Sequence, residues 1–464
     1  MIKIKKKMQI LIKNGLIVTQ KDSIKEDLLI EDGKIARRGN NIEFKHGHEV
    51  PEIDASGMLV IPGGIDPHVH MRLPTPAGYS ADNFRTGSMA ALAGGTTSFI
   101  DFVTPKKGQS LPDAFRQRLN EAENSAVDFS FHVSPISWHQ NLEEEIRECL
   151  TMGVKSFKVY TAYLDTVGIE GEVLKNVVRL LAINGGMLTV HAETGREIER
   201  LRNDYFSQGN ITPLYHALSR PAETESEAIK MLVDLVEIEN CPMYVVHVSA
   251  AQSLSHINSA KNRNLKVYAE TCPQYLVLDQ EKYNQPFNKA AKYVLSPPLR
   301  TKNDNESLWD ALANNTLDTV GTDHCPFTLE QKRLGLADFR KIPNGIGGVE
   351  HRLSLLFSKG VIEKRISLNR WVELISTNPA KIFGLYPRKG SLNIGADADV
   401  VIWNPNTKRT ISAATHKQNT DINAYEGIET TGVPEHVILR GNIVVSNENL
   451  QDTSNLKGSF LRQK

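Results

Sequence analysis

Pro62-Gly63-Gly64-Ile65-Asp66-Pro67-His68-Val69-His70 follows the apolar run Met58 to Ile61 and places two histidines two residues apart. In an extended chain, residues i and i+2 point to the same side, so His68 and His70 can offer two imidazole nitrogens to one metal ion. The alternative is a pair of solvated histidines that flank a turn by chance. Residues further along the chain distinguish between the two interpretations.

Short apolar segments alternate with longer segments of helical pattern through the middle of the chain, an order typical of a parallel sheet or barrel. Eight segments have strand character, and eight is the number that closes a (β/α)₈ barrel. We therefore predict an α/β protein built on a TIM-type barrel. The predicted strands are 59–65, 96–102, 129–134, 154–160, 187–191, 243–248, 265–270 and 319–322. The predicted helices include 82–93, 142–152 and 223–239, of which the first two end at glycines.

Both ends of the chain carry β patterns of similar texture. Residues 8–57 contain short apolar segments separated by Asn14-Gly15 and Asp32-Gly33, turn pairs that are typical of β-hairpins. Similar segments return at 399–403 and 436–445. We expect the two ends to form one small β-sandwich domain, from residues 1–57 and 387–464, beside a barrel domain at 58–386.

Composition excludes several classes of protein. The 464 residues include 54 basic and 54 acidic side chains, which argues against a nucleic-acid partner or an acidic membrane surface. The four cysteines lie far apart without a Cys-x-x-Cys pair, which argues against a disulfide framework or a thiolate zinc site and fits a reducing cytoplasm. The basic N-terminus is followed by too short an apolar run for a signal peptide, and no segment approaches the length of a membrane span.

Residues of metal-binding type fall at or near the ends of the predicted strands. The carboxyl ends of barrel strands meet at one mouth, where the active site of this fold sits. Each residue also has a simpler interpretation, because a strand-end histidine can bond to backbone in the core and an aspartate can cap a following segment. Their coincidence at strand ends favours one shared site. The candidates are His68, His70, Lys158, His191, His247 and Asp323.

Lys158 alternates with Phe157 and Val159 along its predicted strand. A barrel strand is buried on both faces, so an inward lysine is costly unless it is paired or chemically altered. The candidates together exceed the needs of one tetrahedral zinc and suit two metals, which require a bridging anion. A buried lysine with a lowered pKa can capture carbon dioxide as a carbamate and supply that anion. Imidazole and carboxylate ligands favour zinc, with manganese or cobalt as alternatives.

The sequence resembles the amidohydrolase superfamily, and most closely its dihydropyrimidinase and hydantoinase family of cyclic-amide hydrolases. The likeness extends from about residue 8 to Glu426-Gly427. The last three of its motifs separate the chain from more distant members of the superfamily. The motifs are Gly-Gly-Ile-Asp-Pro-His-Val-His at 63–70, Ala-Gly-Gly-Thr-Thr at 93–97, Ser-Phe-Lys-Val-Tyr at 156–160, His-Ala-Glu at 191–193, Glu-Thr-Cys-Pro-Gln-Tyr-Leu at 270–276, Leu-Ser-Pro-Pro-Leu-Arg at 295–300 and Thr-Asp-His-Cys-Pro-Phe at 322–327.

The resemblance implies a role for each candidate. His68, His70 and Asp323 would bind one metal, His191 and His247 the other, and N6-carboxylated Lys158 would bridge two divalent ions, expected to be Zn²⁺. A hydroxide shared by the metals would attack the amide carbonyl, and Asp323 would carry its proton to the departing ring nitrogen. The product would be an N-carbamoyl amino acid.

The same resemblance implies three substrate contacts. Tyr163 would donate a hydrogen bond to the carbonyl oxygen, and backbone groups of Ser296 and Asn344 would hold the edge of the cyclic amide. From sequence alone, Tyr163 could equally be a packing residue, and Pro343-Asn344-Gly345 could be an ordinary turn. The family is typically tetrameric, so a homotetramer is expected.

One loop departs from the family pattern. Hydantoinases usually have an acidic residue at the position of Arg72 and Phe-Gly at that of Thr75-Pro76. Dihydroorotases resemble this sequence in having His-x-His-x-Arg, where the arginine binds a substrate carboxylate, and Arg72 could do the same. Its alternative is a surface arginine paired with an acid such as Asp82. A dihydroorotase- or allantoinase-type cyclic amidase therefore stays open as an alternative.

Two hypotheses come from other classes. A non-catalytic scaffold would resemble the dihydropyrimidinase-related proteins, which keep the fold and lose metal ligands, whereas every ligand position is filled here. A barrel aldolase would use Lys158 to form a Schiff base, but it leaves the four histidines without a role.

Overall fold

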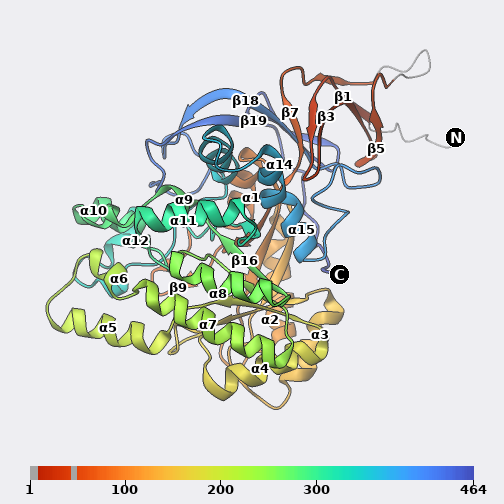
Figure 1. Cartoon of the computed structure of the whole chain (residues 1–464). Coiled ribbons are helices and arrows are strands. Elements are labelled where there is room, and N and C mark those ends of the chain that lie inside the picture. The colour runs from red at the N-terminus through yellow and green to blue at the C-terminus, as the bar shows by residue number, and fades with distance from the viewer. Residues whose placement is uncertain (1–8, 43–49) are drawn as a thin grey trace.

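The computed structural model describes residues 9–42 and 50–464. A parallel barrel wrapped by helices forms most of the molecule, and two β-sheets built from the ends of the chain lie at one side of it (Figure 1). The predicted fold class is confirmed. The basic residues 1–8, for which we expect no signal peptide, lie outside the described residues, as do residues 43–49 of the N-terminal β segment.

Eight parallel strands of the described chain form the barrel sheet, in the order β17-β16-β15-β14-β13-β12-β11-β8. The barrel is closed by a parallel bridge between Val69 and His324, reinforced by the hydrogen bond that His70 N donates to His324 O at 2.8 Å. The strands are β8 (Gly64–Val69), β11 (Thr96–Val103), β12 (Asp128–Val133), β13 (Ser156–Tyr160), β14 (Met187–His191), β15 (Met243–Val245), β16 (Val267–Thr271) and β17 (Thr319–Val320).

The first predicted strand, 59–65, is divided in the structure. β7 (Leu59–Pro62) pairs with strands of the terminal sheet, and the barrel strand β8 begins only at Gly64. Gly63 separates them, where an added Cβ would lie 2.1 Å from Thr97 Oγ1. The close approach to Thr97 explains the glycine. As a result, His68 lies inside the first barrel strand instead of after it.

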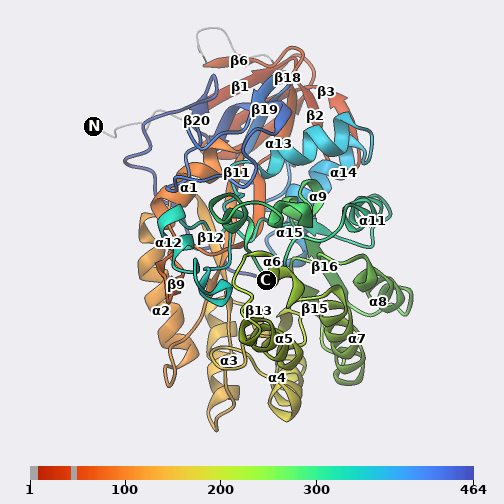
Figure 2. The same cartoon turned by 90° about the vertical axis from the view of Figure 1, so that its left-hand side faces the viewer.

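Helices surround the barrel strands (Figure 2). The predicted helices 82–93, 142–152 and 223–239 are confirmed as α1, α3 and α7, and Gly153 ends α3 with φ 97°. The longer helices are α1 (Phe84–Ala93), α2 (Leu111–Glu121), α3 (Leu142–Met152), α4 (Gly171–Asn184), α5 (Gly195–Ser207), α7 (Ala222–Glu239), α8 (Ala251–Asn262) and α11 (Lys302–Ala313). Short helices include α6 (Leu214–Leu218), α9 (Pro273–Val277), α10 (Phe287–Ala290), α12 (Leu329–Arg333), α13 (Arg352–Leu356), α14 (Leu368–Val372) and α15 (Asn378–Ile382).

The two terminal sheets share one apolar core, which includes Ile12 and Leu28 from the four-stranded sheet and Val60 and Ile402 from the seven-stranded sheet. The larger sheet has the order β21-β20-β19-β18-β7-β2-β3, so strands from both ends of the chain lie in it (Figure 1). The smaller has the order β5-β4-β1-β6. Their strands are β1 (Gln9–Lys13), β2 (Leu16–Val18), β3 (Ser23–Lys25), β4 (Asp27–Glu31), β5 (Lys34–Gly39), β6 (Glu52–Asp54), β18 (Val400–Thr410), β19 (Glu429–Leu439), β20 (Asn442–Ser446) and β21 (Asn449–Leu450).

Only one of the two predicted hairpin turns joins paired strands. Asp32-Gly33, with φ 48° and 79°, connects the antiparallel strands β4 and β5 as expected. Asn14-Gly15 instead carries the chain from β1 in one sheet to β2 in the other, so the hairpin predicted there is wrong. Both glycines suit a sharp change of direction, and long-range pairing decides which strands meet.

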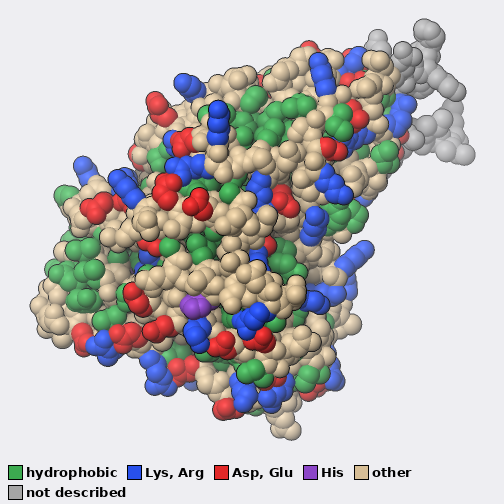
Figure 3. Space-filling view, viewed as in Figure 1, with side chains coloured by type: hydrophobic (Ala, Val, Ile, Leu, Met, Phe, Trp, Pro, Cys, Tyr) green, Lys and Arg blue, Asp and Glu red, His purple; other side chains and the backbone are tan. Residues whose placement is uncertain are grey.

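Lysine and arginine side chains intermingle with aspartate and glutamate over the face shown in Figure 3, in keeping with the formal net charge of zero. The four cysteines are free and buried. Within residues 9–42 and 50–464, no helix is both long and apolar enough to cross a membrane.

Candidate active site

All eight barrel strands contribute a side chain to one cluster or position the residue that does. His68 lies in β8, Lys158 in β13, His191 at the end of β14 and Glu270 in β16. His247 follows β15 by two residues and Asp323 follows β17 by three. The remaining two strands supply Phe102 from β11 and His132 from β12, whose rings lie 4.8 Å apart by centroid. The carboxyl-end site expected from the sequence is therefore assembled in three dimensions.

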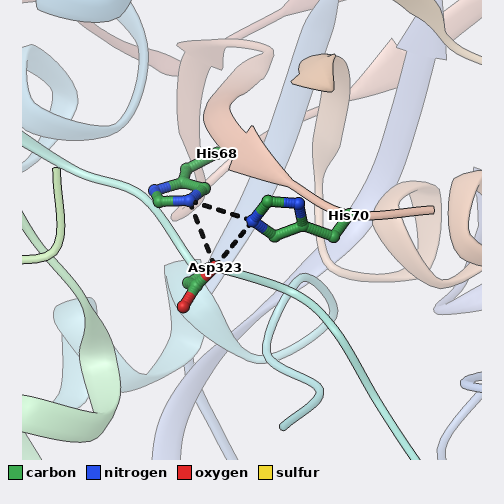
Figure 4. A group of neighbouring side chains, drawn as sticks. All are labelled: His68, His70 and Asp323. Atoms are coloured by element: carbon green, nitrogen blue, oxygen red, sulfur yellow. Dashed lines mark hydrogen bonds and ion pairs between the residues drawn. The ribbon is translucent and has the colours of Figure 1, made fainter. Parts of the chain in front are cut away.

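His68, His70 and Asp323 form the tightest group (Figure 4). Asp323 Oδ1 lies 3.1 Å from His68 Nε2 and 3.0 Å from His70 Nε2, and the two nitrogens are 3.2 Å apart. One ligand atom from each residue thus lies within 4.8 Å of the others. Two imidazole nitrogens and a carboxylate oxygen that converge in this way suit a divalent metal ion.

His191 and His247 form a second pair beside the first group. His191 Nδ1 is 2.9 Å from His247 Nε2, and the ring of His247 stacks against that of His68 with centroids 5.4 Å apart. Two nitrogens therefore converge on a second point next to the first group. This arrangement matches the division into two metal positions that the resemblance implies.

Lys158 lies among aromatic rings in the same region. Its Nζ is 4.8 Å from the ring centroid of Phe102 and 5.1 Å from that of Tyr160, and the residue is 1% exposed. Burial lowers its pKa to about 7, although the charges of Asp323 and Glu270 act in the opposite direction. An amine with this pKa is substantially uncharged at neutral pH, the form that reacts with carbon dioxide.

The charges around the first group favour a cation. Burial alone would lower the pKa of His68, but Asp323 and Glu270 outweigh it and raise that pKa to about 9. The same histidines hold the pKa of Asp323 well below its usual range in spite of burial. The carboxylates of Asp323 and Glu270 thus stabilise a positive charge on the buried imidazole of His68. The same negative charge would stabilise a metal ion, so the residues fit a metal centre.

Two glutamates that the sequence analysis did not single out orient these histidines. Glu270 Oε1 accepts from His68 Nδ1 at 2.7 Å, and Glu193 Oε2 accepts from His191 Nε2 at 2.6 Å. Each bond leaves the other ring nitrogen free to face the cluster, which is how carboxylates usually orient metal-binding histidines. Arg220 forms an ion pair with Glu193, and that arginine outweighs burial to lower the pKa of Glu193 to about 2. Glu193 stands two residues after His191, a spacing that could have identified it.

Three residues of this region have positive φ values. His247, Asp323 and Tyr163 have φ values of 41°, 53° and 58°, in the left-handed region that such side chains rarely adopt. Conformations of this kind cost about 1–3 kcal/mol each and persist where the surrounding structure imposes them, often at functional sites.

Tyr163, the predicted donor to the substrate carbonyl, lies beside the second pair. Its ring centroid is 5.2 Å from that of His191. The side chain of Arg220 is buried, and its guanidinium carbon lies 5.2 Å from the centroid of the tyrosine ring. The structure therefore brings Tyr163 to the candidate metal-binding cluster.

Ser296 and Asn344 belong to neighbouring segments. Gly345 N donates to Val294 O at 3.0 Å, which places the turn at Asn344 beside the segment of Ser296. Ile346, two residues after Asn344, forms a bridge with His324, the residue that follows Asp323. Both predicted contacts are thus tied through backbone pairing to the loop that carries Asp323.

Arg72 lies elsewhere. Its side chain is exposed, and its guanidinium carbon is 4.6 Å from the ring centroid of Tyr79. It lines a surface pocket of about 670 Å³ together with Arg85, Glu121 and Lys457. Asp82, the acid considered as its partner, is bonded instead to His324 Nε2 at 3.0 Å. The structure does not bring Arg72 among the candidate metal ligands.

Comparison with known proteins agrees with this geometry. The amidohydrolase family matches residues 59–444. A D-hydantoinase of Geobacillus stearothermophilus is 46% identical over 94% of this chain and 92% of its own length. A dihydropyrimidinase of Rattus norvegicus is 39% identical over 94% of this chain and 85% of its own.

Solved structures show the same likeness over the whole fold. A dihydropyrimidinase from Brevibacillus agri NCHU1002 superposes with a TM-score of 0.96 at 39% identity, covering 98% of this chain and 99% of that one. The barrel, the terminal sheets and the sequence motifs are therefore shared together. The chain belongs to the dihydropyrimidinase and hydantoinase family of the amidohydrolase superfamily.

Proposed function

We propose that this protein hydrolyses a cyclic amide, opening a hydantoin or dihydropyrimidine ring to an N-carbamoyl amino acid. The observation that carries the proposal is the convergence of His68, His70 and Asp323 on one point, next to the pair of His191 and His247. The relatives named D-hydantoinase and dihydropyrimidinase support the same reaction class.

We assign two divalent ions, expected to be Zn²⁺, to these residues. His68, His70 and Asp323 would hold the first ion, and His191 and His247 the second. Lys158, carboxylated at Nζ, would bridge them, a role supported by its burial and its pKa of about 7. Bound ions would lower the pKa of water and polarise the scissile carbonyl.

The side chains of this chain would guide the proton and the substrate. Asp323, held ionised by the two histidines, would accept the proton of the attacking water and pass it to the leaving ring nitrogen. Tyr163 would donate to the carbonyl oxygen as negative charge develops there. Backbone groups of Ser296 and Asn344 would hold the amide edge. Under the dihydroorotase alternative, Arg72 would contact a carboxylate on the substrate and would have to leave the ring of Tyr79 to do so.

Further parts of the proposal concern the whole protein. We propose that residues 58–386 form the hydrolase domain and that residues 1–57 and 387–464 form the small β domain with a tail. We also propose a homotetramer that works in the cytoplasm, a compartment that suits the four free cysteines.

The decisive experiment is a ring-opening assay with metal-replete protein. The panel consists of dihydrouracil, dihydrothymine, a substituted hydantoin, allantoin and dihydroorotate. We expect turnover of the hydantoin and the dihydropyrimidines, and loss of turnover after metal removal. A strong preference for dihydroorotate or allantoin would instead favour those alternatives and, for dihydroorotate, would support Arg72 as a carboxylate contact.

Two measurements test the alternatives of a non-catalytic scaffold and a barrel aldolase. Metal analysis that finds less than about one ion per purified chain would favour a scaffold. Borohydride trapping of a carbonyl compound on Lys158 would favour the aldolase.

A further inference from the structure

Lys332 belongs to the short helix α12, which follows Asp323 in the chain, and its side chain is fully buried at 0% exposure. Its Nζ donates to three backbone carbonyl oxygens: Val294 at 2.8 Å, Pro343 at 2.7 Å and Gly345 at 2.8 Å. The three hydrogens of one ammonium group therefore match three acceptors from two separate segments. Burial lowers the pKa of Lys332 to about 7, but three acceptors at hydrogen-bond distance suit the charged form, because a neutral amine has only two N–H bonds to donate.

The segments joined by Lys332 are those that carry the proposed contacts with the amide edge. Ser296 stands two residues after Val294, and Asn344 lies between Pro343 and Gly345. The turn at Asn344 has little freedom of its own, because Gly345 has φ 144° and an added Cβ there would lie 2.4 Å from Cys325 O. Through these bonds, Lys332 holds the segment of Ser296 and the turn of Asn344 at a fixed distance from each other.

The bond to Pro343 also has an electronic effect. The carbonyl of Pro343 and the N–H of Asn344 belong to one peptide group. A cation on the carbonyl oxygen polarises that group and makes its N–H a stronger donor, the same cooperativity that strengthens chains of hydrogen bonds in a medium of low dielectric constant. This N–H belongs to the backbone of Asn344, one of the two residues whose backbone groups are proposed to hold the amide edge.

We propose that Lys332 is a positioning residue for substrate recognition: it holds the segments of Ser296 and Asn344 together and strengthens the Asn344 N–H as a donor to the ring carbonyl that is not hydrolysed. This inference rests on the proposed function and adds a determinant of affinity that touches neither substrate nor metal.

The test compares hydantoin with its 2-thio analogue, in which sulfur, a weaker acceptor, replaces the oxygen of the carbonyl that is not hydrolysed. In Lys332→Met we expect KM for hydantoin to rise about tenfold, the size of effect that follows from weakening one buried charge-assisted hydrogen bond. The wild-type preference for the oxygen substrate in kcat/KM should fall about fivefold, because the donor has lost its polarising cation. Metal content per folded chain should not change.

The preference is a ratio of two substrates measured on one preparation, so it does not depend on how much of the variant folds. Lys341→Met is the matched control, since Lys341 is an exposed lysine nearby in the chain, and it should keep the wild-type ratio. If the wild-type protein is active and Lys332→Met keeps both the wild-type KM and the wild-type ratio of kcat/KM for the two substrates, the proposed role of Lys332 is wrong. The proposed function would not be affected by that result. Wild-type protein that opens neither hydantoin nor any other ring of the panel would overturn the proposed function and this inference with it.

Discussion

Lys158 and Lys389 are both buried lysines, 1% and 2% exposed, but they lie in different surroundings. Lys389 Nζ donates to Asp128 Oδ2 at 2.6 Å and to Asp399 Oδ2 at 2.7 Å, and lies 3.1 Å from Asp397 Oδ2. These carboxylates outweigh burial and raise the pKa of Lys389 above its ordinary value. Lys158 contacts aromatic rings instead, and burial lowers its pKa to about 7.

The neighbouring groups decide whether a buried lysine stabilises the fold or is available as a reactive amine. Asp128 begins β12, and Asp397 and Asp399 precede β18, so Lys389 joins the amino end of the barrel to the terminal sheets. A lysine among carboxylates is a permanent cation and holds segments together. A lysine among aromatic rings is a reactive amine, which agrees with the carbamate proposed for Lys158.

The largest expected effect comes from removing the reactive amine. Lys158→Ala should lower turnover of every substrate by about 10³-fold or more, equivalent to at least about 4 kcal/mol in the activation barrier, because no bridging anion can form. The assay is ring opening with metal supplied in excess, and circular dichroism checks the fold. Turnover near the wild-type level would remove the basis for a carbamate at this position.

Lys389→Met should affect stability and spare the chemistry. Three aspartates would lose their shared cation, and breaking a buried ion pair in this way costs about 3–5 kcal/mol. Denaturant unfolding measures the loss, and kcat per folded chain should stay close to the wild-type value. Lys381→Met, at an exposed lysine in α15, is the control and should change little. An equal loss in both variants would contradict the structural role of Lys389.

The stability difference between wild type and Lys389→Met should depend on pH. Lys389, together with Lys34 and Arg388, outweighs burial and lowers the pKa of Asp397 from 3.8 to about 2, so the contribution of these three cations is complete above pH 4 and is lost as the pH falls through 2. It amounts to about 2 kcal/mol for the three cations together, and Lys389 supplies the largest part. The difference in unfolding free energy between the two proteins should therefore become smaller as the pH falls from 7 to 2. Curves that stay parallel would contradict the link to Asp397.

The smallest effect is expected at Lys34, which lies at the exposed edge of the group formed by Lys389 and its aspartates. Lys34 Nζ lies 2.5 Å from Asp397 Oδ1, but its side chain is half exposed. Water and salt screen such a pair, so Lys34→Met should cost less than about 1 kcal/mol. Denaturant unfolding compares it directly with Lys389→Met. A loss of similar size in the two variants would mean that burial of the lysine does not set the strength of this cluster.

Much of the candidate site follows from local sequence. Ligand types at strand ends, the His-x-His spacing and an apolar strand interrupted by Lys158 are local patterns, and the structure brings those residues together. The partners that orient them were missed, because Glu270 and His68 are 202 residues apart and nothing local links them. Lys332 was missed for the same reason, since its acceptors belong to distant turns.

The sequence by itself determined the alternation of strands and helices, the family and the residue types gathered at the barrel mouth, because periodicity and motif spacing are properties of short segments. Tertiary structure alone decided that Gly63 divides two strands, that Asn14-Gly15 passes between sheets, and that Arg72 faces Tyr79. It also decided that Lys389 lies among carboxylates and Lys158 among aromatic rings. The physical reason is that strand pairing and pKa values depend on groups far away in the chain, which meet only after folding.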